Sequence, residues 1–205
     1  MEIAPFDPAS YPGPRPDGPC LVHEGAVHEA VLPAAPVAGP RADADAEVTD
    51  LDAVRWVVAY GSNASPSRLV DKGLDARGAW LLPATLEGWA TTFEDRPTRY
   101  GSIPLTLVPD DGARLETWVL GVHVADLATL DRTEGRYPAD VVAVDDGHSA
   151  PPGVYRLGHV GEVEVADRWR LPDALAYLPG ARTRVQVTAE GAWRTWPRWD
   201  QAAAA

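Results

Sequence analysis

Apolar positions in this chain gather in short runs and alternating stretches, and few segments carry the spacing of an amphipathic helix. The run Trp56–Tyr60 is apolar and β-branched, which is typical of a buried strand. It ends at Gly61, and Ser65 followed by Pro66 is typical of a helix start, with an N-cap and a proline at the first helical position. The pattern therefore predicts a strand, a glycine turn and a short helix that ends near Gly73.

The remaining periodicity predicts mostly strands. The segment Cys20–Leu32 fits one strand or a small hairpin, a turn is predicted at Pro109–Gly112, and helices are expected at 125–133 and 172–178. Gly121, inside an expected strand, indicates a bulge or a close approach of another group. Further strands are expected at 80–86, 89–93, 103–108, 115–124, 141–144, 154–157, 159–165 and 184–187.

This order of elements favours an α+β fold, a small and mostly antiparallel β-barrel with a few short helices. Residues 1–50 are rich in proline, alanine and acidic side chains, with a linker composition over 33–50. We therefore expect an N-terminal extension at 1–50, with residues 1–45 outside the barrel core, followed by one domain at 51–200.

Composition narrows the function classes. A net charge of −12 argues against a general nucleic-acid binder, because phosphate contacts need basic residues. Cys20 is the only cysteine, which excludes an internal disulfide. No apolar run approaches the ~20 residues of a membrane span, and the start of the chain lacks the pattern of a signal peptide. We expect a cytoplasmic protein that uses no metal and no cofactor.

Two motifs carry a resemblance to a known family. Tyr60, Gly61, Ser62 and Asn63 follow a hydrophobic strand, and Leu127–Gly135 is a leucine- and aspartate-containing segment that ends in Glu134-Gly135. In this order and spacing the chain resembles the γ-glutamylcyclotransferase-like family over residues 54–157. The resemblance implies a barrel with a cavity at one mouth, Glu134 as the catalytic residue, and a substrate pocket near Tyr60, Gly61, Ser62, Asn63, Tyr137 and Tyr155.

The implied reaction is an intramolecular attack of the substrate α-amine on its γ-glutamyl carbonyl, which releases 5-oxoproline and a free amine or amino acid. One carboxyl group can serve as general acid and base, and backbone N–H groups at the Gly61 turn can stabilise the oxyanion. This role requires Glu134 to be substantially buried, whereas the alternative is an exposed glutamate at a helix end. Ser62 is an alternative nucleophile, although no histidine is placed by the sequence to activate it.

Several alternatives stay open at this stage. Asn63 fits either fixing the loop or holding substrate, and Tyr60 fits either the core or the cavity. Ala64 stands where the family usually has leucine or methionine, which reshapes the pocket. Besides the cyclotransferase, the chain fits a γ-glutamyl-removing or acyl-transferring tailoring enzyme, or a non-catalytic small-molecule-binding protein. The expected partner is a small γ-glutamyl substrate, with no nucleic acid or membrane, and a homodimer is left open.

Overall fold

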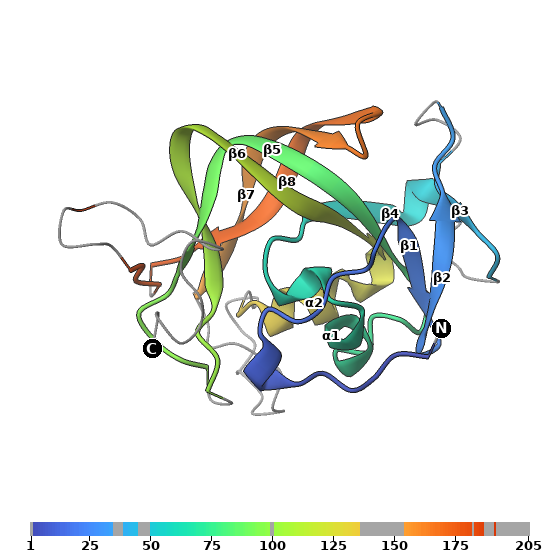
Figure 1. Ribbon diagram of the computed structural model, residues 1–205, viewed down its shortest axis with the longest axis horizontal. Coiled ribbons are helices and arrows are strands. Elements are labelled where there is room, and N and C mark those ends of the chain that lie inside the picture. The colour runs from blue at the N-terminus through green and yellow to red at the C-terminus, as the bar shows by residue number, and fades with distance from the viewer. Residues whose placement is uncertain are drawn as a thin grey trace.

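The computed structural model describes residues 2–34, 39–44, 50–98, 101–135, 154–181, 183–186 and 191. Sheet dominates this part of the chain, with two short α-helices and several 3-10 turns (Figure 1). The elements are η1 (Pro8–Ser10), β1 (Cys20–His23), β2 (Ala26–Val31), β3 (Arg41–Ala42), η4 (Leu51–Ala53), β4 (Val54–Val58), η5 (Ser62–Ala64), α1 (Pro66–Asp71), β5 (Ala79–Phe93), β6 (Leu105–His123), η6 (Val124–Asp126), α2 (Leu127–Thr133), β7 (Tyr155–Val165) and β8 (Trp169–Pro179).

The strands form one mixed sheet in the order β3-β2-β1-β5-β6-β4-β8-β7. A further pairing of β5 with β7 closes a ring of strand pairs through β5, β6, β4, β8 and β7. The pairs are antiparallel except for β4 with β8, which run parallel. The α+β class is therefore confirmed in its coarser form, a mixed and sheet-dominated fold with few short helices. In Figure 1, β5 and β6 arch over α1 and α2.

The strand, turn and helix predicted around Gly61 are present. Strand β4 leads to Gly61, and Ser65 is the N-cap of α1 with Pro66 in its first turn. Gly73 follows the C-cap with φ +68, a conformation that glycine adopts at no steric cost. Helix α2 agrees with the helix predicted at 125–133. These two helices bring their ends, and therefore the two sequence motifs, to one side of the sheet.

The helix predicted at 172–178 is wrong, because this segment lies inside strand β8. It pairs with β7 along its length, from Tyr155 opposite Pro179 to Val165 opposite Trp169. It also pairs with β4, with Val57 opposite Leu175. Two backbone ladders therefore override the local signal of a proline followed by an amphipathic stretch.

The turn predicted at Pro109–Gly112 does not end a strand, so this part of the prediction is also wrong. Strand β6 is continuous, and residues 110–113 lie opposite Gly88 alone, because Pro109 pairs with Trp89 and Arg114 pairs with Glu87. The turn residues thus form a wide irregularity in the β5–β6 ladder. The close approach predicted at Gly121 is confirmed, since a Cβ there would lie 2.6 Å from the ring of Trp56 on β4.

The hairpin alternative for Cys20–Leu32 is confirmed by the pairing of β1 with β2. This hairpin was expected to lie outside the core, but it joins the main sheet. Strand β1 pairs with β5, with Cys20 opposite Leu81 and Leu21 opposite Trp80. Leu21 is 0% exposed. The expectation that residues 1–45 lie outside the core therefore does not hold for β1 and β2. The division of the chain at residue 50 into separate folding units stays a prediction that truncation can test.

Candidate active site

The turn after β4 forms the first half of the site. Ser62–Ala64 is a single 3-10 turn in which the Gly61 carbonyl accepts from the Ala64 N–H at 3.1 Å. Within the described part of the chain, the backbone N–H groups of Gly61, Ser62 and Asn63 donate no hydrogen bond. Consecutive N–H groups without partners can stabilise an oxygen that carries negative charge.

The second half of the site is Glu134, at the C-cap of α2. Its backbone N–H bonds to carbonyls of the last helical turn, and Gly135 follows with φ +70, so the helix ends as its sequence predicts. The Asn63 side-chain amide donates to Glu134 Oε1 at 3.1 Å. Residues 71 positions apart in the sequence therefore meet, and the two motifs form one site.

Lys72 completes this arrangement and was not found from the sequence. Its ammonium donates to Glu134 Oε1 at 3.0 Å and also to the Asn63 side-chain oxygen. The side chains of Lys72 and Glu134 are 3% and 13% exposed, so the ion pair is almost dry. Burial lowers the pKa of Lys72, while the charge of Glu134 acts in the opposite direction. In the sequence, a lysine before Gly73 resembles an ordinary cation at a helix end, and no local pattern indicates its burial.

The two described tyrosines of the predicted pocket, Tyr60 buried and Tyr155 partly buried, lie in a polar cluster beside this site. The Tyr60 hydroxyl donates to the carbonyl of Tyr177, and burial together with the charge of Glu134 raises the pKa of Tyr60. The Tyr155 hydroxyl donates to the carboxylate of Glu94. Tyr137 lies outside the described residues, so its place in the pocket stays a prediction.

Glu94 is a second buried carboxyl group that sequence reasoning missed. It is 7% exposed at the end of β5. Burial raises the pKa of Glu94 from 4.5 to about 7, the charge of Glu134 adds to this effect, and the hydrogen bond from Tyr155 opposes it. The region therefore holds two carboxyl groups in different settings, with Glu134 paired to a cation and Glu94 bonded to a phenol.

Residues 2–19, here called the N-terminal segment, run past α1 and the turn (Figure 1). Arg15 Nη1 donates to the Gly61 carbonyl at 2.7 Å, and Nη2 donates to the Tyr60 carbonyl at 3.1 Å. A Cβ at Gly61 would lie 3.2 Å from the Tyr11 hydroxyl. That hydroxyl accepts from the Leu105 N–H at 2.9 Å. The segment therefore packs against the turn at Gly61.

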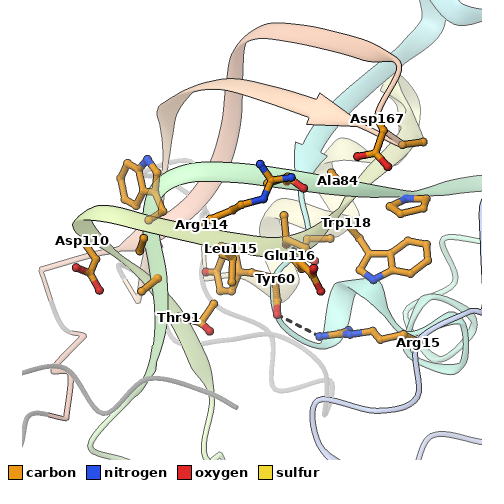
Figure 2. A pocket seen from close by; sticks show the side chains of 18 of the residues that line it. Arg15, Tyr60, Ala84, Thr91, Asp110, Arg114, Leu115, Glu116, Trp118 and Asp167 are labelled. Atoms are coloured by element: carbon orange, nitrogen blue, oxygen red, sulfur yellow. Dashed lines mark hydrogen bonds between the residues drawn. The ribbon is translucent and has the colours of Figure 1, made fainter. Parts of the chain in front are cut away.

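A groove of about 1100 Å³ opens beside the same turn. Its walls include Arg15, Tyr60 and Trp118, and Figure 2 shows Arg15 reaching Tyr60 below the indole of Trp118. Glu134 does not line this groove. The turn consequently adjoins two environments, a dry ion pair at Asn63 and an open groove at Tyr60.

No family model matches the chain, and no curated protein matches its sequence. Among solved structures, the chain resembles an uncharacterised protein from Homo sapiens with 18% identity and a TM-score of 0.48, over 65% of this chain and 70% of that one. It is similar, with 17% identity and a TM-score of 0.48, to a structure described as a gamma-glutamyl cyclotransferase, over 65% of this chain and 69% of that one. A protein from Arabidopsis thaliana has 19% identity and a TM-score of 0.45, over 68% of this chain and 74% of that one. One of these structures carries the name of the family that the two motifs resemble.

Proposed function

We propose that this protein is a γ-glutamyl cyclotransferase in which Glu134 is the general acid and base. The observation that supports it best is the hydrogen bond between Asn63 and Glu134, which joins the two motifs at a nearly dry position. An exposed glutamate at a helix end, the alternative weighed from the sequence, does not fit a side chain that is 13% exposed.

In this mechanism the glutamyl unit folds so that its α-nitrogen faces its own γ-carbonyl carbon, a geometry that removes most of the entropic cost of ring closure. The α-ammonium gives one proton to the Glu134 carboxylate, and the freed amine attacks the γ-carbonyl to form the five-membered lactam. The leaving nitrogen takes this proton from Glu134 as the C–N bond breaks. Glu134 then accepts the second proton, which the ring nitrogen loses as it becomes the lactam N–H, and passes it to the departing amine, which leaves as an ammonium ion. The products are 5-oxoproline and a free amine or amino acid, and Glu134 returns to its starting form.

The turn and Lys72 stabilise two negative charges, the oxyanion that forms on the γ-carbonyl and the Glu134 carboxylate from which the path starts. The backbone N–H groups of Gly61 and Ser62 make no other hydrogen bond among the described residues and can donate to the oxyanion. Lys72 compensates the buried charge of Glu134 and, together with Asn63, fixes the direction of its carboxylate. Asn63 therefore holds the catalytic carboxylate as well as belonging to the turn.

The test is a panel of γ-glutamyl compounds assayed for 5-oxoproline by mass spectrometry. Glu134→Gln preserves the shape of the side chain and removes the proton carrier, so turnover should fall by ~10²–10⁴. Glu87→Gln, an exposed change on β5, is the matched control and should retain wild-type turnover. Unchanged turnover in Glu134→Gln would remove the central residue of the proposal.

One observation favours a second candidate, a small-molecule-binding protein without turnover. The Lys72 ammonium already contacts Glu134, in the manner expected for a substrate α-ammonium. If this contact persists when ligand binds, the positive charge of Lys72 makes Glu134 a weaker proton acceptor. Binding of a γ-glutamyl compound to wild-type protein without any 5-oxoproline would favour this candidate. Gain of binding in Lys72→Met would support it further.

A further inference from the structure

Arg15 is held at the edge of the candidate site by the backbone of the turn. Its two terminal nitrogens donate to the carbonyls of Gly61 and Tyr60 at 2.7 and 3.1 Å. A guanidinium group has five N–H donors, and these contacts use two of them. The side chain is therefore fixed in direction while three donors remain for another partner.

Within the described part of the chain, no carboxylate lies within ion-pair distance of Arg15. This is unusual for a half-buried cation, because charges removed from water are ordinarily paired. Burial lowers the pKa of Arg15 to about 10, which leaves it protonated near neutral pH. Arg15 Nε has no partner among the described residues and is absent from the buried polar atoms that lack one, so this donor remains accessible.

The accessible side of Arg15 faces a space that can hold an organic ligand. Arg15, Tyr60 and Trp118 line the groove of about 1100 Å³ beside the turn (Figure 2). Clefts that bind small molecules combine apolar and aromatic walls with a few placed polar groups. Glu116, Asp110 and Asp167 line the same groove, and none of them pairs with Arg15. The groove has two arginines among its described lining residues, Arg15 and Arg114. Arg114 pairs with Glu87 at 2.9 Å, whereas Arg15, here called the groove cation, has no carboxylate partner among the described residues.

The groove cation and Glu134 stand at opposite ends of one short turn. Arg15 contacts the carbonyl of Gly61, and Glu134 contacts the side chain of Asn63. The Cα atoms of Gly61 and Asn63 are separated by at most about 7 Å, since two residues span no more. In a γ-glutamyl amino acid, the carboxylate of the leaving part lies a few bonds from the γ-carbonyl. One such molecule can therefore reach both ends.

We propose that Arg15 forms a carboxylate-binding subsite for the leaving group, so that the substrates are γ-glutamyl amino acids and not γ-glutamylamines. This inference rests on the proposed function. The guanidinium presents its remaining N–H donors as a fork, the geometry that a carboxylate accepts with two parallel hydrogen bonds. Arg15 acts on specificity here and does not touch the reacting atoms.

The test compares γ-glutamylalanine with γ-glutamylethylamine, which differ only by the carboxylate of the leaving group. Wild-type protein should prefer γ-glutamylalanine in kcat/KM. Arg15→Met should reduce that preference by roughly 10–100-fold, the value of one charge-assisted contact, mainly through KM. Arg15→Lys keeps the positive charge but loses the paired N–H donors of the guanidinium, so its preference should lie between those of wild type and Arg15→Met. Arg170→Met, which removes an exposed arginine outside the groove, should keep the preference.

A second measurement separates this subsite from the reaction itself. Titration of wild-type protein and Arg15→Met with L-alanine and with ethylamine, followed by protein NMR, reports carboxylate binding without turnover. Arg15-dependent binding of L-alanine without any 5-oxoproline from either substrate would retain the subsite and reject the cyclotransferase. Equal kcat/KM for both substrates in wild-type protein would reject the subsite and retain the cyclotransferase. An equal loss for both substrates in Arg15→Met and Arg15→Lys would also reject it, because Arg15 would then only hold the turn.

Discussion

The turn Gly61–Asn63 and the N-terminal segment touch each other, yet they acquire their structures in different ways. The turn follows from local sequence: an apolar strand, a glycine, and a Ser-Pro pair that starts α1. The segment has few internal contacts and takes its course from distant residues. Arg15 bonds to residues 45 and 46 positions away, and Tyr11 to a residue 94 positions away.

This difference separates two contributions to the candidate site. The turn supplies backbone donors and places Asn63 against Glu134. The N-terminal segment packs against Tyr60 and Gly61 and supplies a cation that the turn itself lacks. A cation–π contact also holds the N-terminal segment against α1, since the Arg68 guanidinium lies 5.2 Å from the Phe6 ring centroid. A short motif can thus define the chemistry, while a segment with no recognisable pattern defines which molecules fit.

Truncation should have the largest effect. A chain that starts at Val48 lacks β1, whose Leu21 and Val22 are 0% exposed, and leaves Trp80 and Leu81 of β5 without their partner strand. We expect loss of the cooperative thermal transition and of near-UV circular dichroism, because a buried strand and its ladder are removed.

A chain that starts at Gly18 is the matched control. It keeps β1 and β2 and removes the residues that pack against the turn, together with the contacts of Glu2 and Ile3 with the β1–β2 hairpin, so it should melt cooperatively. A Val48 truncation with native near-UV dichroism and a sharp transition would show that residues 51–200 fold by themselves, as the composition of the first 50 residues suggests.

The sequence predicted the elements whose signals are local. Helices α1 and α2, the hairpin before Leu32 and the close approach at Gly121 all follow from capping residues, turn residues or a glycine within a strand. It failed for 172–178, where β8 is defined by pairing with strands far away in the sequence. Strand pairing of this kind has no local signature, and a proline with flanking apolar residues fits both structures.

The candidate site shows the same limit. Family motifs indicated Glu134 and Asn63, which the structure brings into contact. Lys72 and Glu94 carried no motif, and each has an altered pKa because the fold buries it. Burial depends on the whole tertiary arrangement, so charged residues that look solvated in the sequence can become part of an interior cluster.

Glu94→Gln should have the next largest effect, on the pH dependence of stability. The pKa of Glu94 is raised from 4.5 to about 7 on folding, so the folded state holds a proton that the unfolded state releases between these values. The stability contributed by protonated Glu94 is full below pH 4.5 and is lost as pH rises through about 7. The change amounts to about 3 kcal/mol in the free energy of unfolding.

Glutamine does not titrate, so Glu94→Gln should be stabilised relative to wild type by more at pH 8 than at pH 4.5. Urea unfolding at several pH values measures the difference. Glu87→Gln, with its exposed side chain, should show almost no such trend. Parallel pH profiles for wild type and Glu94→Gln would mean that Glu94 titrates normally in the folded protein.

Tyr11→Phe tests the docking of the N-terminal segment with a smaller expected effect. The change removes the acceptor of the buried Leu105 N–H and should cost about 2 kcal/mol of stability. Amide hydrogen exchange at Gly61–Asn63 should become faster, because the segment that covers the turn is held less firmly.

Tyr177→Phe is the matched control, since it removes a buried phenol that donates to Asp131 on α2 at 2.8 Å. It should lower stability without releasing the N-terminal segment. Equal exchange at the turn in both variants would indicate that only global stability changed, and the two regions would then not be coupled through Tyr11.

Ser62→Ala should have the smallest effect and tests how the turn works. Among the described residues the Ser62 hydroxyl makes no hydrogen bond, so its loss leaves the backbone N–H groups in place. Turnover should change by less than about tenfold, against ~10²–10⁴ for Glu134→Gln. Steady-state assays of both variants on one γ-glutamyl substrate give the comparison. An inactive Ser62→Ala beside a nearly normal Glu134→Gln would replace the proton shuttle with a serine acyl-enzyme, and the turn would then act through a side chain rather than through its backbone.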